Sequence, residues 1–431
     1  MNSGPDKDIY KRSRVLYWVE GAFEWLISIL CSGAFLAKLT GAVGISDSTT
    51  AILTSIISFA SLAQFASIYI SHRAPVKRFV IPITLVSNLL MSGLFLLPLI
   101  STKGGVTVIF FIIFLVARFL ISSVIAVKTT WYFNLVPEHK RGMFVAVTQI
   151  TSLVAGMIFS LIAGRIVDEF EAAGNLNGAF ITLSLCILTF SVINFLSLAF
   201  SKEKKSSLKE DAEEKIGESL KKLFKNKNYR ALCIIQLLNS IGCGIAMPFF
   251  GTYQINELGF TITYVTVINL IYQLVKLASV TLFGKLSYKI SYKALKLIAF
   301  PIYSLSYLVM TFTAPQNGMV LYIIFVVIFY VGVGAYDVAD TNLLLSAVPQ
   351  KQQTAALSFN AIIAGVSTFV TTVAISPLVD FMQDRGNQLF GVTVYAQQIL
   401  SFAACIIYLA AAICLKLMVK KSPREHSVTD L

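Results

Sequence analysis

The feature that most constrains this chain is a series of apolar segments, each long enough to cross a lipid bilayer as a helix. A helix needs about 20 apolar residues to span the hydrocarbon region. Charged residues make up only 13% of the 431 residues, against about 25% in a typical soluble protein. The sequence therefore predicts an all-α membrane protein with twelve transmembrane helices, at residues 16–40, 48–71, 78–100, 106–132, 142–164, 177–200, 229–253, 262–286, 293–313, 317–346, 353–378 and 392–418.

The segments fall into two groups of six, separated by a charged stretch. We expect an N-terminal six-helix bundle over 1–200, a charged cytoplasmic linker over 201–228, a C-terminal six-helix bundle over 229–418 and a cytoplasmic tail over 419–431. Within the linker, the amphipathic run Ile216–Phe224 is typical of a helix that lies on the membrane surface.

Lysine and arginine predict the orientation, because loops rich in positive charge stay on the cytoplasmic side. With twelve spans, one side of the membrane holds only four of the 35 basic residues, Lys38, Lys103, Arg165 and Arg385. Both termini are therefore expected in the cytoplasm. The short loops favour a bacterial inner membrane. We expect a monomer whose partners are the lipid bilayer and a small-molecule substrate.

The two halves also resemble each other in sequence, with residue numbers 212 higher in the second half. This offset places Asn134-Leu-Val-Pro137 on Ser346-Ala-Val-Pro349, and Val167-Asp168 on Val379-Asp380. Internal repeats of this kind are typical of secondary transporters, in which the solute site lies between the repeats near mid-membrane.

Two sets of six spans, a charged central loop and cytoplasmic termini resemble the major facilitator superfamily over nearly the whole chain. That family's loop between its second and third spans commonly reads G-x-L-x-D-R-x-G-R-[KR]. The run from Gly284 to Lys293 keeps the glycine, the leucine and the basic positions, with Tyr288 and Ser291 in place of the aspartate and the second glycine. Arg118 resembles the arginine of the family's R-x-x-Q-G pattern, without its glutamine and glycine. The resemblance implies a carrier that works by alternating access.

Ionisable side chains inside the predicted spans are costly, so each one needs a reason. Such residues are Glu20 and Glu24 in the first span, Arg118 and Lys128 in the fourth, Lys276 in the eighth, and Asp337 and Asp340 in the tenth. The two acids of each pair lie four or three residues apart, which puts them on one face of their helix. In the family that this sequence resembles, the first, fourth, seventh and tenth spans line the central cavity. The resemblance therefore implies that most of these charges lie in the cavity.

These four acids and three bases leave one carboxylate without a counter-charge. Burial favours the neutral form of such a group, and a carboxyl that gains and loses a proton is what a proton-coupled carrier needs. The candidates for proton coupling are Glu24, Asp337, Asp340 and Glu20, and the candidate counter-charges are Arg118, Lys276 and Lys128. The alternative is that these groups form salt bridges that hold helices together, or reach water near helix ends.

Neutral polar side chains inside the spans supply candidates for the substrate cavity, namely Trp25, Gln149, Gln236, Asn239, Asn269 and Gln273. An indole face combined with amides suits a sugar or another polar organic solute. The alternative is that the amides hydrogen-bond neighbouring helices.

Motifs of other functions are missing. The chain has no HExxH, GxSxG or Walker motif, so neither an enzyme nor an ATP-driven pump is expected. The cysteines and histidines lack the spacing of metal ligands, so we expect no metal site and no cofactor. The net charge of +13 is spread over loops, without a basic domain that would indicate nucleic-acid binding.

Together these features favour a secondary active transporter that moves a small polar organic solute by alternating access. Proton-coupled symport is favoured, with a sugar or a similar nutrient as the solute. Two alternatives stay open. One is efflux of a drug or metabolite by proton antiport, and the other is a carrier-like fold that serves as a membrane sensor without transport.

Overall fold

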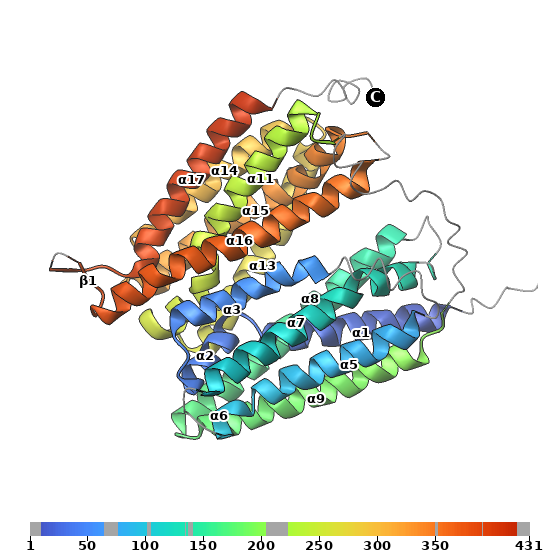
Figure 1. Ribbon diagram of the computed structural model, residues 1–431, viewed down its shortest axis with the longest axis vertical. Helices are drawn as coiled ribbons and strands as arrows, with labels where there is room; N and C mark the ends of the chain where they lie inside the picture. Colours follow the sequence, from blue (N-terminus) through green and yellow to red (C-terminus); the bar gives the residue numbers. More distant parts are fainter. Residues whose placement is uncertain are drawn as a thin grey trace, which may run out of the picture. The chain divides into compact units, whose positions relative to one another are not determined.

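The computed structural model describes residues 10–63, 76–100, 105–133, 135–136, 141–203, 223–349, 352–389 and 391–419. Most of the predicted surface helix Ile216–Phe224 and the tail after residue 419 lie outside these ranges. The first half of the described chain forms α1 (Lys11–Leu30), α2 (Gly33–Val43), α3 (Asp47–Phe59), the 3₁₀ helix η1 (Ala60–Ala63), α5 (Lys77–Leu94), α6 (Leu97–Ile100), α7 (Gly105–Phe133), α8 (Arg141–Ala172) and α9 (Leu176–Phe200), as Figure 1 shows.

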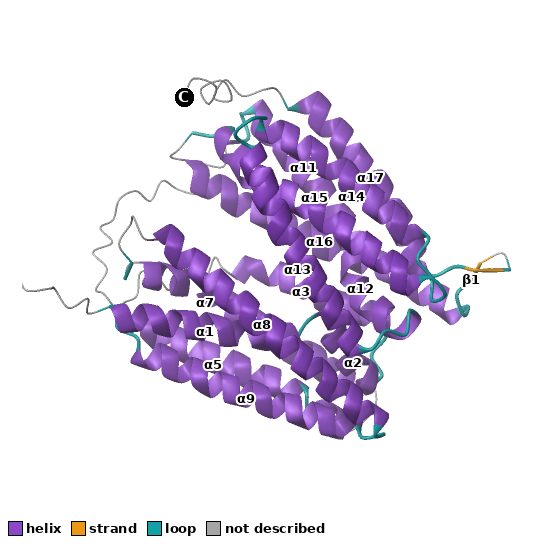
Figure 2. Ribbon diagram, turned by 180° about the vertical axis from the view of Figure 1, so that it is seen from behind, coloured by secondary structure: helices purple, strands orange, loops and turns teal. Residues whose placement is uncertain are grey.

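The second half is also helical, apart from one short hairpin (Figure 2). Its elements are α11 (Lys227–Ala246), η3 (Met247–Phe249), α12 (Phe250–Thr252), the π-helical turn η4 (Tyr253–Glu257), α13 (Ile262–Leu286), α14 (Tyr292–Thr311), α15 (Gly318–Ser346), α16 (Gln353–Asp384), β1 (Gln388–Leu389), β2 (Val392–Thr393) and α17 (Ala396–Met418). Strands β1 and β2 pair antiparallel. Each predicted transmembrane segment coincides with one or more of these helices.

The helices are built for a lipid environment. Within the described residues nine helices are long and apolar enough to cross a membrane, and α1 with α2, bent by 45°, forms a tenth candidate span. Helices α3 and α5, with the short helices that follow them, occupy the other two predicted spans. On α8 the exposed side chains recur every four residues, at Ile150, Val154, Ile158 and Ile162. An apolar stripe of this kind is suited to lipid contact. The predicted all-α membrane fold is therefore confirmed, and these helices are consistent with twelve spans.

Contacts along the chain divide it into two compact units, of which the first holds Met1–Ile45, Ala60–Lys209 and Thr261–Thr266. Within this unit α1 packs against α8 and α9, and α5 packs against α7 and α9. A buried apolar cluster joins α5, α7 and α9 and includes Val80, Val124, Val127, Trp131, Tyr132 and Leu198. This cluster anchors the end of α7 that carries Lys128.

The second unit holds Ser46–Phe59, Glu210–Phe260 and Val267–Leu431. Here α14 packs against α15 and α17, α11 against α16 and α17, and α3 against α16. A buried cluster of α13, α14 and α15 contains Phe283, Leu295, Ala299, Ala335 and Ala339. The predicted bundle boundaries at residues 200 and 229 stay a prediction.

The helix bounds follow the sequence offset of 212 residues in the middle of each half. Raising the bounds of α8 by 212 gives residues 353–384, which are the bounds of α16. The same shift brings α7 to residues 317–345, one residue from the bounds of α15. The repeat seen in the sequence thus extends to the lengths of these helices.

The approach of α13 to α15 depends on a glycine. A Cβ added to Gly334 of α15 would lie 2.8 Å from the backbone carbonyl carbon of Ser279 on α13. Small residues allow membrane helices to approach this closely. One turn further along α15, Asp337 forms an ion pair with Lys276 of α13. The missing side chain at position 334 therefore sets the helix spacing at which this ion pair forms.

Substituting Gly334→Ala is expected to lower the free energy of unfolding by about 1–3 kcal/mol, because the added methyl group overpacks against backbone atoms. The thermal unfolding midpoint of the detergent-solubilised protein measures this effect. Gly284→Ala on α13 is the control, because a Cβ at that position meets no heavy atom within 4 Å. Equal midpoints for the two variants would contradict the close approach of α13 and α15.

Candidate functional site

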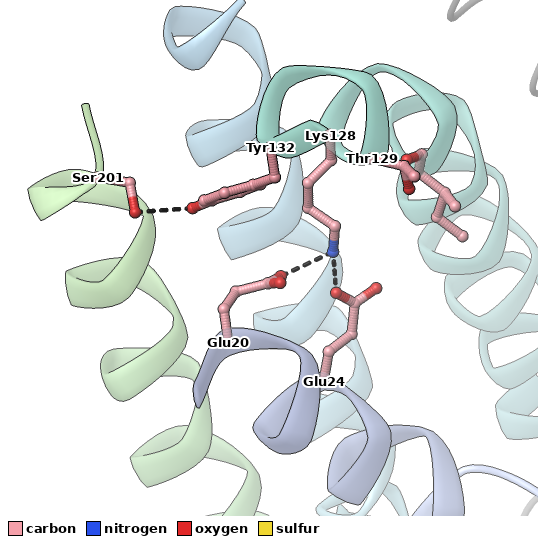
Figure 3. A network of polar contacts seen from close by, with 7 residues as sticks. Glu20, Glu24, Lys128, Thr129, Tyr132 and Ser201 are labelled. Carbon is pink, nitrogen blue, oxygen red and sulfur yellow. Dashed lines mark hydrogen bonds and ion pairs between the residues drawn. The ribbon is translucent and has the colours of Figure 1, made fainter. Parts of the chain in front are cut away.

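A buried cluster of three charged side chains joins α1 to α7 in the first unit (Figure 3). The Nζ atom of Lys128 lies 2.7 Å from Oε1 of Glu20, and it also forms an ion pair with Glu24. The Glu20 side chain is fully buried, whereas that of Glu24 is 22% exposed. Glu20 and Glu24 are one turn apart on the same face of α1, so both reach the one ammonium group. The structure thus brings together three of the predicted site residues.

Aromatic rings close this cluster on one side. The ring of Tyr17 lies 4.2 Å from that of Tyr132 and 5.3 Å from that of Phe144, centroid to centroid. The Tyr132 hydroxyl donates to Oγ of Ser201 at 2.8 Å, which ties the end of α7 to the end of α9 (Figure 3). Lys128 and Glu20 are buried, at 5% and 0% exposed, and burial strengthens the attraction between the charges.

The cluster holds two carboxylates but only one ammonium group. In a buried ion pair, attraction has to offset the loss of hydration of both partners, and Lys128 cannot do this fully for two acids. Oε2 of Glu20 is buried without a hydrogen-bond partner among the described residues. A proton shared between Glu20 and Glu24 would remove the excess negative charge. Of the two acids, Glu24 is the one with access to its surroundings.

Arg118 does not join this cluster, although it was expected to face an acid. Its Nη2 atom donates to the carbonyl oxygen of Cys31 at 2.8 Å, and its guanidinium lies 5.2 Å from the centroid of the Phe114 ring. The side chain is 8% exposed. No ion pair of Arg118 with a carboxylate occurs in the part of the chain that the structure describes.

In the second unit, Lys276 of α13 pairs with Asp337 of α15 at 2.9 Å. Both side chains are nearly half exposed, at 44% and 43%. Close by in sequence on the same helices, Tyr272 and Tyr330 stack with their centroids 4.3 Å apart. This pair has one charge of each sign, so it needs no further proton to be neutral.

Asp340 pairs with Lys296 of α14, a residue that the sequence reasoning missed. Lys296 lies only three residues from the predicted start of its span, and a lysine so near the end of a span was assigned to the loop. In the structure its side chain is 2% exposed. It also lies over the ring of Tyr336, at 4.8 Å. Lys296 adds a fourth base to the intramembrane set and corrects the predicted surplus of one acid. The surplus is instead local to the cluster around Lys128.

The predicted neutral cavity residues fall into different environments. Gln236 is 6% exposed, and its Oε1 accepts from the Tyr336 hydroxyl at 2.9 Å. The amide of Gln273 donates to the backbone oxygen of Asn269 at 3.1 Å, while its own oxygen is buried without a partner among the described residues. Asn239 is partly exposed, and Gln149 is exposed on α8.

Trp25 is 40% exposed and lies against a glycine. A Cβ added to Gly156 of α8 would lie 2.7 Å from the indole Nε1 of Trp25. Gly156 therefore creates the space in which this indole packs between α1 and α8. The sequence alone did not connect Trp25 with Gly156, because the two residues are far apart along the chain.

The 212-residue offset relates one charged residue of the first unit to a residue of opposite charge in the second. Lys128 corresponds to Asp340, and Glu24 corresponds to Gln236. In the first unit a cation on α7 meets acids from α1, and in the second an acid on α15 meets a cation from α14. The repeat has thus kept one charged position with its sign reversed, and the partners at the two positions come from helices that do not correspond under the offset.

Comparison with known proteins agrees with the fold. A sequence model described as the Major Facilitator Superfamily matches residues 17–372. No curated protein sequence gives a significant match. Among solved structures, a D-xylose-proton symporter is 14% identical with a TM-score of 0.73, covering 96% of this chain and 99% of that one.

Two further structures share the fold along nearly their full length. The nucleoside transporter NupG is 12% identical with a TM-score of 0.70, covering 95% of this chain and 98% of that one. A bacterial homologue of the human lysosomal transporter Spinster is 11% identical with a TM-score of 0.68, covering 98% and 99%. Because the family match spans most of the sequence and the fold agrees with it, this chain belongs to the Major Facilitator Superfamily and is a multi-pass membrane transporter.

Proposed function

We propose that this transporter moves a small polar organic solute together with protons, by alternating access of its two six-helix bundles. The observation that carries the proposal is the position of Lys128 between Glu20 and Glu24. Two carboxylates that share one ammonium group, one fully buried and the other 22% exposed, have an excess negative charge, which a single proton neutralises. We assign proton binding to this cluster, with Glu24 as the acid that exchanges the proton.

The charge of the cluster would link proton binding to the change of conformation. An uncompensated charge inside a membrane helix costs up to about 3 kcal/mol on insertion scales, the value at the helix centre, and this upper value corresponds to roughly a hundredfold in population. A state in which the cluster is shut off from water would thus be populated mainly in its protonated form. The protonated carrier would exchange between its outward-facing and inward-facing states, whereas the unprotonated carrier would stay in one of them until it binds a proton.

The names of two similar structures support the class of solute. One is a D-xylose-proton symporter and another is a nucleoside transporter, and both names refer to polar organic nutrients. For this chain we propose a solute of the same general kind, contacted within the second unit by the amides of Gln236, Asn239 and Gln273. We further propose a monomer in the cell membrane of a bacterium, with both termini in the cytoplasm.

The acids of the second unit have a different proposed role. Asp337 pairs with Lys276 and Asp340 pairs with Lys296, so each pair has one negative and one positive charge. We assign both pairs to the association of α15 with its neighbours α13 and α14. This assignment narrows the original set of proton candidates to Glu20 and Glu24.

The variant Glu24→Gln tests the proton assignment, since it leaves a balanced Glu20–Lys128 pair. In proteoliposomes with an imposed gradient of one pH unit, the wild type should accumulate its solute up to about tenfold for each coupled proton. The variant should equilibrate the solute without accumulation and should retain solute exchange. Uptake of a panel of radiolabelled sugars, nucleosides and other polar solutes provides the measurement.

The matched control is Glu171→Gln, because Glu171 pairs with Lys38 in the same unit but is 47% exposed. The control should accumulate solute like the wild type. Normal accumulation by Glu24→Gln would show that the cluster does not carry the proton. Accumulation driven by the opposite gradient would establish antiport, and a wild type that moves no solute at all would favour the sensor alternative.

The variant Lys296→Met tests the assignment of the second unit. It leaves Asp340 without its partner, and breaking a buried ion pair in this way costs about 3–5 kcal/mol. The double variant Lys296→Met with Asp340→Asn removes both charges, so its thermal midpoint should recover most of this loss. If the double variant is no more stable than the single one, the pair does not stabilise the packing of α14 on α15.

A further inference from the structure

The first transmembrane span is broken near Cys31. Helix α1 ends at Leu30 and α2 begins at Gly33, with a bend of 45° between them. Gly33 has a φ of +54°, a left-handed conformation that glycine adopts without strain. Broken membrane helices expose backbone polar groups that need partners, and such breaks are tolerated where they are buried in protein or line a cavity.

Helix α2 begins without a side-chain cap. Ser32 occupies the N-cap position, but its side chain makes no capping hydrogen bond to α2. Its hydroxyl instead donates back to the carbonyl oxygen of Ser28 at 2.8 Å. The first N–H groups of a helix have no partner within the helix, and those of Gly33, Ala34 and Phe35 have no hydrogen-bond partner among the described residues. They carry the positive end of the helix dipole.

The buried guanidinium of Arg118 is directed at the same break. It donates to the carbonyl oxygen of Cys31, the residue that ends α1. Arg118 is 8% exposed, and its Nε atom has no hydrogen-bond partner among the described residues. A guanidinium has five N–H donors, of which the described contacts satisfy one. A full positive charge and a helix N-terminus thus lie together in a region of the described chain where no carboxylate pairs with them.

We infer that this break binds a carboxylate group of the transported solute, which makes the substrate a small polar organic acid. A single carboxylate matches one guanidinium in charge and accepts two hydrogen bonds from it in parallel, while helix N-terminal N–H groups favour the same anion. Gly33 is exposed, and a Cβ on it would meet nothing within 4 Å, so there is room for the ligand beside the N-terminus. This inference rests on the proposed transport function and specifies its solute.

The anion site and the proton cluster lie on the same two helices. Glu24 and Cys31 are seven residues apart, or about 10 Å along a helix. Arg118 and Lys128 are ten residues apart on α7, or about 15 Å. A solute that brings one negative charge to the break would travel with one proton at the cluster. Their combined charge is zero, so transport should be independent of the membrane potential.

The test uses the full-length protein in lipid nanodiscs and three pairs of probes that differ in a carboxylate: gluconate and glucose, nicotinate and nicotinamide, lactate and propylene glycol. Inorganic phosphate and chloride complete the set. At least one of the acids at millimolar concentration should raise the thermal midpoint by about 2 °C or more, and its neutral partner should not. Arg118→Gln should abolish this shift, whereas Arg165→Gln, which changes an exposed arginine of α8, should retain it.

A second variant keeps the test valid if Arg118→Gln fails to fold. In Ser32→Asp, a built-in carboxylate should cap α2, because aspartate is a strong N-cap residue, and should occupy the site. This variant should be at least as stable as the wild type and should lose the response to the acid. Retained binding by Ser32→Asp, equal shifts with acids and neutral partners, a response to phosphate or chloride only, or no response to any acid would each overturn the inference.

Transport assays on the same probes separate this inference from the proposed function. If an acid binds through Arg118 but no probe crosses the membrane of proteoliposomes, the anion site stands and the transport proposal fails. If neutral solutes are accumulated and no acid binds, the proton-coupled function stands and the anion site is wrong. A wild type that carries the acid at the same rate with and without a membrane potential would support both.

Discussion

The proposed proton coupling of this transporter depends on one contact, in which the ammonium group of Lys128 is shared between two carboxylates of α1. Charges inside a membrane are stable only when they are paired or hydrogen-bonded, and here the pairing is incomplete by one negative charge. We propose that the incomplete pairing makes the cluster sensitive to protons, whereas the complete pairs Lys276–Asp337 and Lys296–Asp340 need no proton to be neutral. The same physical requirement thus produces two kinds of site in one protein.

The internal repeat relates one charged position of each unit. Lys128 and Asp340 are related by the 212-residue offset. Lys128 is buried between its two acids, whereas the Asp340 side chain is 20% exposed and pairs with the buried Lys296. Because the helix backbones α7 and α15 match in length, a change of sign at this position required new partners on neighbouring helices. Those partners come from α1 in one unit and from α14 in the other. A shared backbone therefore supports an unbalanced cluster on one side of the repeat and a balanced pair on the other.

Much of the fold was predictable because helix length and hydropathy are local properties of the sequence. The apolar segments coincide with the helices of the structure, and the face shared by Glu20 and Glu24 follows from their spacing. Partners were less predictable. Arg118 contacts a backbone carbonyl that becomes available only because α1 breaks at Cys31, and no composition rule identifies such a break. Lys296 was missed because burial near the end of a span depends on how α14 packs against α15, which is a tertiary property.

We propose that solute and proton move together through this protein. The most direct measurement records both fluxes at once, in proteoliposomes that contain the purified protein and a pH-sensitive dye. When solute is added outside with no initial proton gradient and with the membrane potential clamped at zero, we expect the lumen to become more acidic as solute enters, at a fixed ratio of protons to solute. Solute entry with no change in internal pH would show that the two do not move together.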